Sequence, residues 1–375
     1  MITSLSLEQY RNMTSFELSN ISPITIFTGP NGVGKTNSLE AIALAGGSQW
    51  RRYRKISEVV QWGQSYAGVE LHFSNRSINE IRFVVKSNKA HYLVDKQTVR
   101  AQRVQHELAM MVFTPSMVML FSGEPEPRRQ FLDSLLQSLY PEYAEALSQY
   151  KKVLKMRNAA LKQKALSQLP LWEDQLATHA TVILLSRQWL LRTLTDIVDL
   201  NGTCYYTPSP QKIAPLLEYR PQVREMLHNS AGKVREYLRD KWATLRDKEL
   251  IVGFSLMGPQ RDDWGFRGFF SNSSSQLSEN EIDVGMFGSR GQERLSVIKV
   301  QLAGLSLLEE YHNYGPLWLL DDVFAELDST HQQYVVDACQ KYQTFITSTN
   351  KEYPGIRNLL SLDITNLVEL PMNTA

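Results

Sequence analysis

Alternating hydrophobic and polar residues mark the first hundred positions of the chain as a region of short strands. Residues 69–73, 81–85 and 91–94 alternate with the period of two that a half-buried strand requires. Residues 2–7 alternate more weakly, and residues 24–27 form a short apolar run that leads into a glycine-rich loop. The pattern predicts a strand-rich N-terminal region with some helix.

From about residue 127 the hydrophobic period becomes helical. Phe131, Leu135 and Leu139 recur every fourth position, and a leucine- and alanine-rich tract continues to about residue 200. Further elements follow this tract. They are helices at 212–228, 231–247, 291–311 and 329–341, and strands at 250–256, 317–320 and 345–347. Strands that alternate with helices are typical of a parallel sheet covered on its faces.

The order of these elements predicts a fold of the α/β class that contains a mixed sheet. Residues 1–115 and 250–375 are expected to form one split nucleotide-binding head, and residues 116–249 a mostly helical arm that interrupts it. A chain of 375 residues is long enough for two or three domains with cores of their own.

Composition narrows the class of protein further. No apolar run approaches the roughly 18 residues that a membrane helix needs, and the first residues lack the pattern of an export signal. The two cysteines, Cys204 and Cys339, are far apart and lack metal-ligand spacing. These features favour a protein of the reducing cytoplasm, without a membrane partner.

Charge is nearly balanced over the whole chain, with a formal net charge of +1. Residues 116–249 contain 19 basic and 15 acidic residues, whereas the remainder contains 21 and 24. Any nucleic-acid contact therefore requires basic residues gathered on one surface.

The glycine-rich loop has the spacing G-x-x-x-x-G-K-T of a phosphate-binding loop. It consists of Gly29, Pro30, Asn31, Gly32, Val33, Gly34, Lys35 and Thr36. Its position between an apolar strand and a helix-forming run is the context that this motif requires. The glycines permit a nest of backbone N–H donors for a phosphate, Lys35 supplies a positive charge, and the Thr36 hydroxyl is suited to Mg²⁺. The loop predicts binding of a nucleoside triphosphate.

An apolar strand at 317–320 ends in Asp321 and Asp322. A carboxylate at the end of such a strand reaches the Mg²⁺ of a nucleotide site, and the next acidic side chain is placed to orient an attacking water. We therefore assign Asp321 to the metal and Asp322 to catalysis. Asp328 follows shortly before a predicted helix, where a simple helix cap is the alternative role.

A third element, Ser289, Arg290, Gly291 and Gln292, opens the helix at 291–311. Unpaired N–H groups and the helix dipole favour an anion at such a position. By itself the segment is most often a plain helix cap. Its position about 30 residues before the acidic strand strengthens the interpretation as part of the nucleotide site.

Together the three elements resemble the ABC-type ATPase head, in which the serine-glycine motif of one subunit completes the nucleotide site of another. The resemblance implies an ATP-dependent homodimer in which Ser289 and Gly291 contact the γ-phosphate held by Lys35 of a second copy. In that family a loop of the nucleotide site follows the acidic strand, and the resemblance places Asp328 in this loop.

Within ABC-type ATPases the chain resembles the RecF family of bacterial recombination mediators nearly from end to end. The segments that carry this resemblance are Tyr10-Arg11-Asn12, the residues 36–42, the residues 127–133, the residues 258–263, the Ser-Arg-Gly-Gln motif and the residues 320–328. The resemblance implies ATP and Mg²⁺ as ligands, dimerisation on duplex or gapped DNA, and assistance to RecA loading together with RecO and RecR.

Two positions depart from what the resemblance implies, whereas Asp322, where transporters have glutamate, follows the RecF pattern. Gln260 stands where histidine is usual, and Asn350 lies where transporter heads place a switch histidine. Neither can take a proton as an imidazole does. Asp322 is one methylene shorter than the glutamate of transporters, so its carboxylate lies about 1.5 Å farther from the water, a displacement that can cost on the order of 10²-fold in rate. We expect slow hydrolysis. The glutamine that senses Mg²⁺ in transporters has no clear counterpart, and the region of Thr114-Pro115 is its expected location.

Two basic segments are candidates for DNA contact. Lys151, Lys155 and Lys162 lie in a stretch without acidic residues and project within about 40° of one another on a helix. Arg51 and Arg52 follow the phosphate-loop helix, beside aromatic residues. A solvated helix face is the alternative for the lysines, and a contact with the nucleotide or a second head is the alternative for the arginines. Neither segment indicates reading of base edges.

Two other functions share the ATPase head. An SMC-like structural ATPase requires a long coiled-coil tether, but no heptad pattern of that length occurs between residues 116 and 249. A transporter ATPase subunit is disfavoured by the arginine after Ser289 and by the helical arm. Copurification with a membrane permease would favour the transporter, and ATP-dependent dimerisation enhanced by duplex DNA would favour the recombination mediator.

Overall fold

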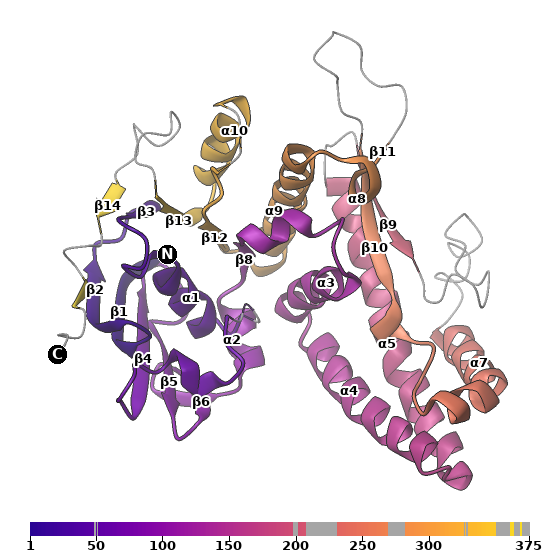
Figure 1. Cartoon of the computed structure of the whole chain (residues 1–375). Coiled ribbons are helices and arrows are strands. Elements are labelled where there is room, and N and C mark those ends of the chain that lie inside the picture. Colours follow the sequence, from indigo (N-terminus) through magenta and orange to yellow (C-terminus); the bar gives the residue numbers. More distant parts are fainter. Residues whose placement is uncertain are drawn as a thin grey trace. The chain divides into compact units, whose positions relative to one another are not determined.

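The computed structural model describes residues 1–48, 50, 52–197, 202–207, 231–268, 282–325, 327, 329–349, 361–363 and 368–369. Its internal contacts divide the chain into two compact units (Figure 1). We call Met1–Val118 with Val297–Ala375 the head unit, and Met119–Ser296 the arm unit.

The first sheet of the head unit is antiparallel and has seven strands. In spatial order they are β15 (Val368–Glu369), β2 (Met13–Ser19), β1 (Ile2–Tyr10), β4 (Tyr66–Phe73), β5 (Glu80–Lys86), β6 (Lys89–Val94) and β7 (Gln97–Val99). In β4, Ala67, Val69 and Leu71 are buried, whereas Glu70 and His72 between and beyond them are partly exposed. The alternation in the sequence thus matches a sheet that buries one face.

The second sheet of the head unit is parallel and has five strands. In spatial order they are β14 (Ser361–Asp363), β3 (Ile24–Thr28), β13 (Gln343–Ser348), β12 (Leu317–Asp321) and β8 (Met110–Phe113). Every residue of β12 and β13 is buried. The continuous apolar run of β12 is typical of a strand covered on both faces, whereas β13 buries polar residues beside Phe345 and Ile346. The predicted mixture of strand directions is therefore divided between two sheets.

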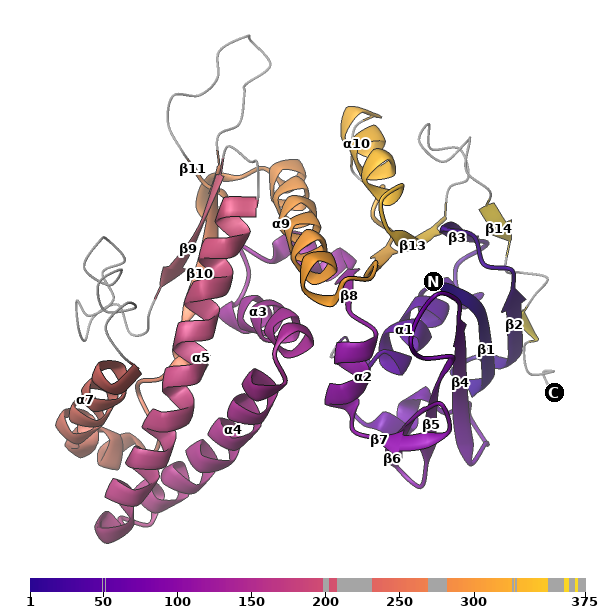
Figure 2. The same cartoon turned by 180° about the vertical axis from the view of Figure 1, so that it is seen from behind.

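Helix α1 (Lys35–Ala45) lies between the two sheets and contacts β4 and β5 of the first and β12 and β13 of the second (Figure 2). Its apolar side chains are buried on all sides, so no amphipathic pattern marks it in the sequence. The other helices are α2 (Ala101–Glu107), α10 (Ser329–Cys339) and the short 3-10 helices Ile56–Val59 and Pro115–Met119. Helix α9 (Arg290–His312) begins in the arm unit and continues in the head unit.

The arm unit is built mainly from helices. These are α3 (Pro125–Leu139), α4 (Pro141–Lys162), α5 (Leu169–Ile197), α7 (Ala231–Val252), α8 (Val284–Phe287) and the 3-10 helices Leu166–Gln168 and Pro259–Arg261. Helices α4 and α5 run side by side, and α7 packs against α5. A small antiparallel sheet joins β11 (Ile282–Asp283), β10 (Asp263–Gly268) and β9 (Gly202–Thr207).

Three sequence expectations concern this unit. The strand predicted at 250–256 is wrong, because α7 continues to Val252 and residues 253–256 form a turn and irregular backbone. The helix predicted at 212–228 lies outside the described residues. The arm was predicted to end at residue 249, whereas the contacts place residues up to Ser296 in the arm unit, since β10 and α8 pack together and β10 packs on α3.

None of the described helices combines the length and the hydrophobicity that crossing a bilayer requires.

Candidate nucleotide-binding site

The phosphate-binding loop joins the end of β3 to the start of α1, as its motif requires. Gly29, Gly32 and Gly34 have φ values of 144°, 85° and 116°, a region that L side chains rarely adopt. A Cβ on Gly34 would also lie 3.1 Å from the sulfur of Met13. The glycines are thus required by the backbone path of the loop.

Lys35 is the first residue of α1, and its side chain folds back over the loop. Its Nζ donates hydrogen bonds to the carbonyl oxygens of Gly29 at 2.8 Å and Pro30 at 2.9 Å. Burial lowers the pKa of Lys35 from its ordinary value, while the Asp322 and Asp321 carboxylates act in the opposite direction. A buried ammonium whose hydrogen bonds go to neutral carbonyls is available to an incoming anion.

Thr36 and Asp321 meet at the end of the parallel sheet. The Thr36 hydroxyl donates to Asp321 Oδ1 at 2.8 Å, and the Thr347 hydroxyl donates to the same oxygen at 2.7 Å. Asp321 and Thr347 are register partners in the neighbouring strands β12 and β13, which explains their approach. The hydroxyl of Thr36 and the carboxylate of Asp321 are hard oxygen donors suited to Mg²⁺.

Asp322 follows β12 in the left-handed backbone region, with φ at 50°. Aspartate tolerates this conformation better than most residues. Its backbone N–H donates to the Thr347 hydroxyl at 3.0 Å, which fixes the turn. Asp321 and Asp322 are thereby both placed at the pocket, as the sequence predicts.

A pocket of about 280 Å³ unites these groups within the head unit. It is lined by Asn31, Gly32, Gly34, Lys35, Thr36, Asn37, Arg52, Pro115, Asp321, Asp322, Thr347, Ser348 and Thr349. Pro115 lies in the region where the Mg²⁺-sensing residue is expected. Thr347, Ser348 and Thr349 lead toward Asn350, which is outside the described residues, as is Asp328.

Several residues at the pocket had no role assigned to them from the sequence. The Asn12 amide donates to the Gly32 carbonyl at 2.8 Å, and Asn37 donates to the Asn12 side chain at 2.8 Å. Arg52 in turn donates to Asn37 at 3.4 Å. Asn12 and Asn37 therefore brace the phosphate loop. Both lie in segments that carry the family resemblance, Tyr10-Arg11-Asn12 and residues 36–42, but neither had an assigned role.

Glu40 fixes the segment that carries Arg52. It is fully buried in α1 and accepts two hydrogen bonds from the Arg11 guanidinium, at 2.8 and 3.0 Å. It also accepts from the Tyr10 hydroxyl at 3.2 Å and from the backbone N–H of Arg52 at 3.2 Å. Burial, together with the Glu40 carboxylate, raises the pKa of Tyr10 well above its usual range. Arg51 lies outside the described residues.

The Ser-Arg-Gly-Gln motif opens α9 as a reciprocal cap. The backbone N–H of Gln292 donates to the Ser289 hydroxyl at 3.3 Å, and the Ser289 N–H donates to the Gln292 side chain at 2.8 Å. Ser289 and Arg290 are exposed, and a Cβ added to Gly291 would meet no atom within 4 Å. The plain cap is therefore present, and its outer side leaves space for an approaching group.

The basic stretch of α4 contains both exposed and buried side chains. Lys151, Lys155 and Lys162 are exposed on α4 and form no ion pair with any described residue. Arg157 from the same stretch is instead fully buried, so it is not part of a basic surface.

Gln260, at the family's histidine position, accepts a hydrogen bond from the Tyr150 hydroxyl and donates to the Met257 carbonyl at 3.1 Å. That glutamine serves packing within the arm unit.

Comparison with known proteins agrees with this architecture. A family model described as the RecF/RecN/SMC N terminal domain matches residues 1–357. The DNA replication and repair protein RecF of Bacillus mycoides is 30% identical over 382 residues and covers 97% of both chains. The protein of that name from Geobacillus sp. is 32% identical over 366 residues, with 94% of this chain and 92% of the relative covered.

Among solved structures, the recombination mediator protein RecF with ATP, of the RecFOR pathway, has a TM-score of 0.78 to this chain. It is 24% identical, and the match covers 94% of this chain and 92% of that one. The two chains therefore share a fold. With the family model and the relatives, this establishes that the chain belongs to the RecF family.

Proposed function

We propose that this member of the RecF family is an ATP-dependent DNA-binding protein of recombinational repair and replication. The observation that carries the proposal is the meeting of Lys35, Thr36 and Asp321 in one pocket at the phosphate loop. The relatives are named as DNA replication and repair proteins, and a solved relative is described with ATP. These names support the same assignment for this chain.

In the proposed site, the loop N–H groups and Lys35 bind the β- and γ-phosphates of ATP. Thr36 and Asp321 would hold Mg²⁺, which supplies charge that stabilises the transferred phosphoryl group. Asp322 orients the attacking water. The shorter reach of aspartate makes the proposed ATPase slow, so that ATP acts as a switch and is consumed slowly.

The proposed active form is a dimer held together by ATP. The Ser289 hydroxyl, the N–H groups at the start of α9 and Gly291 present donors to an anion, and their outer side is open. A second copy supplies this motif to the γ-phosphate held by Lys35. ATP then contacts both chains, and its hydrolysis releases them.

DNA is the proposed macromolecular ligand of the dimer. Lys151, Lys155 and Lys162 are exposed, and each can track phosphates without reading bases. Binding is expected to depend on DNA structure and on salt, with duplex DNA at a gap as the substrate. RecO and RecR are the proposed protein partners, and the outcome is assistance to RecA loading.

Sedimentation velocity of the full chain tests the ATP dimer. The chain is compared without nucleotide, with ADP and with a non-cleavable ATP analogue, each with Mg²⁺. Only the analogue is expected to shift the wild-type chain to a dimer. The variant Ser289→Arg should bind the analogue and stay monomeric, because the added side chain blocks the contact with the γ-phosphate.

A matched control adds arginine elsewhere on the surface. Ser167 is exposed in the arm unit, and Ser167→Arg should dimerise like the wild type. A wild-type chain that binds the analogue and remains monomeric would overturn the proposed dimer. A chain that does not bind the analogue would overturn the assignment of the pocket itself.

A further inference from the structure

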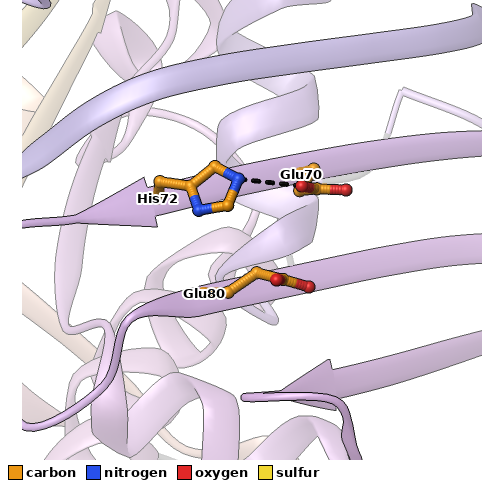
Figure 3. A group of neighbouring side chains, drawn as sticks. All are labelled: Glu70, His72 and Glu80. Atoms are coloured by element: carbon orange, nitrogen blue, oxygen red, sulfur yellow. Dashed lines mark hydrogen bonds and ion pairs between the residues drawn. The ribbon is translucent and has the colours of Figure 1, made fainter.

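A second group of ligand-bearing side chains lies in the head unit, on the antiparallel sheet. Glu70 and His72 are two positions apart in β4, so both lie on the partly exposed face of the sheet. Glu80 in β5 is the register partner of His72. Figure 3 shows the three side chains together on the two neighbouring strands.

The geometry of the group brings three donor atoms close together. His72 Nε2 lies 2.8 Å from Glu70 Oε1, and one ligand atom from each of the three residues lies within 4.8 Å of the others (Figure 3). In a tetrahedral zinc site the bonds are about 2.0–2.2 Å long, which separates ligand atoms by about 3.3–3.5 Å. Rotation of the glutamate side chains covers the remaining distance.

We propose that Glu70, His72 and Glu80 form a binding site for a divalent transition-metal ion of the zinc class. An imidazole with two carboxylates is a donor set that suits Zn²⁺. Mg²⁺ prefers an octahedral shell of oxygens, so the imidazole selects against it. The metal takes the place of the direct contact between His72 and Glu70, and water completes its coordination.

The backbone under the three ligands is fixed on both strands. The Thr3 hydroxyl donates to the His72 carbonyl at 3.2 Å. The Asp95 side chain accepts from the N–H groups of Asn79 at 2.9 Å and Glu80 at 3.0 Å. Binding therefore needs only side-chain movement, which keeps its entropic cost low.

Arg82 is the main competitor for the metal. It is the register partner of Glu70, and its Nε lies 3.8 Å from Glu70 Oε2. The two side chains are 48% and 33% exposed, so this ion pair is weak. Its removal should strengthen metal binding, because a positive charge then leaves the site.

The site is separate from the nucleotide pocket. Its ligands lie on β4 and β5 of the antiparallel sheet, whereas the pocket is built on loops after strands of the parallel sheet and on α1. A bound metal ties β4 to β5 and is expected to stabilise the head unit. The two sites can therefore be tested independently.

Equilibrium titration of the full chain with Zn²⁺ tests the proposal, with Co²⁺ absorption as a second readout. Both use a Thr36→Ala background, which weakens competition from the nucleotide pocket. One Zn²⁺ should bind per chain and raise the melting temperature. His72→Ala and Glu80→Gln should weaken binding at least about tenfold and remove the visible Co²⁺ bands of the bound ion.

The control variants probe the same sheet. His91→Ala removes an exposed histidine of β6 outside the group and should leave binding unchanged. Arg82→Gln should tighten binding, which a mere loss of folding could not produce. Equal Zn²⁺ affinity in the wild type and in a folded His72→Ala chain would overturn the proposal, as would an unchanged Co²⁺ spectrum.

Discussion

Two buried cations, one in each unit of the molecule, have opposite kinds of partner. Lys35 in the head unit is 8% exposed and donates to backbone carbonyls at 2.8 and 2.9 Å. Arg157 in the arm unit is fully buried and contacts the carboxylates of Glu173 at 2.9 Å and Glu249 at 2.6 Å. Arg157 also donates to the Ser255 hydroxyl at 2.7 Å.

The difference separates a binding charge from a structural one. Arg157 ties α4 to α5 and α7 through two carboxylates. Its removal leaves the buried Glu249 without its charged partner and leaves Glu173 with Arg246 alone, at 2.6 Å. Lys35 faces a pocket and is held by neutral groups that a phosphate can replace. Burial alone thus does not reveal the role of a cation, whereas the charge of its partners does.

The largest effect on stability is expected from Arg157→Ala. The buried Glu249 carboxylate loses its charged partner and Glu173 keeps only Arg246, which should lower the free energy of unfolding of the arm unit by about 3–5 kcal/mol. Urea denaturation followed by circular dichroism measures this loss. Affinity for an ATP analogue should stay within about twofold in the folded variant. A loss of stability below about 1 kcal/mol would contradict the structural role.

Lys35→Ala should produce the reverse result, a loss of ATP affinity with little change in stability. Loss of the ammonium should weaken binding of ATP by at least about 10²-fold, close to 3 kcal/mol. Its carbonyl partners remain accessible to water at the pocket, so stability should change little. Calorimetric titration with a non-cleavable analogue measures the affinity. Unchanged affinity would remove Lys35 from the phosphate site.

Asp322→Asn tests the catalytic role assigned to Asp322, as distinct from the metal-binding role assigned to Asp321. Asparagine retains the size of the side chain but cannot polarise water as a carboxylate does. Turnover of ATP should fall by about 10²-fold or more while binding is retained. Steady-state phosphate release, compared with analogue affinity, gives both values. Unchanged turnover would exclude Asp322 as the catalytic residue.

Arg235→Ala should have the smallest effect on stability. It allows an exposed ion pair of the arm unit to be compared with the buried pairs of Arg157. Arg235 lies 2.7 Å from Asp174, but the two side chains are 42% and 39% exposed. An exposed ion pair contributes less than about 1 kcal/mol. The same urea assay should therefore separate Arg235→Ala clearly from Arg157→Ala. A similar loss in both variants would show that burial does not decide the energy of these pairs.

Much of the nucleotide site could be predicted from local sequence. The phosphate loop, β12 with Asp321 and Asp322, and the start of α9 are each encoded in one short segment. Their local context of strand, loop and helix needs no knowledge of distant residues. The braces Asn12 and Asn37 were not assigned, because the contact that joins them connects residues 25 positions apart in the sequence.

The arm shows where such prediction ends. Arg157 reads as one of several basic residues in α4, but its partners lie 16 and 92 residues away in the sequence. The end of α7 was misjudged for a related reason. Residue Leu250 packs on the small core cluster of Ala160, Leu161 and Leu169, and tertiary packing outweighs its local strand character.

A structure of the chain with a non-cleavable ATP analogue and Mg²⁺ tests the central contrast most directly. We expect Lys35 Nζ to leave the carbonyls of Gly29 and Pro30 for phosphate oxygens, while Arg157 keeps Glu173 and Glu249. An analogue bound away from this loop, or bound with Lys35 still on both carbonyls, would contradict the account.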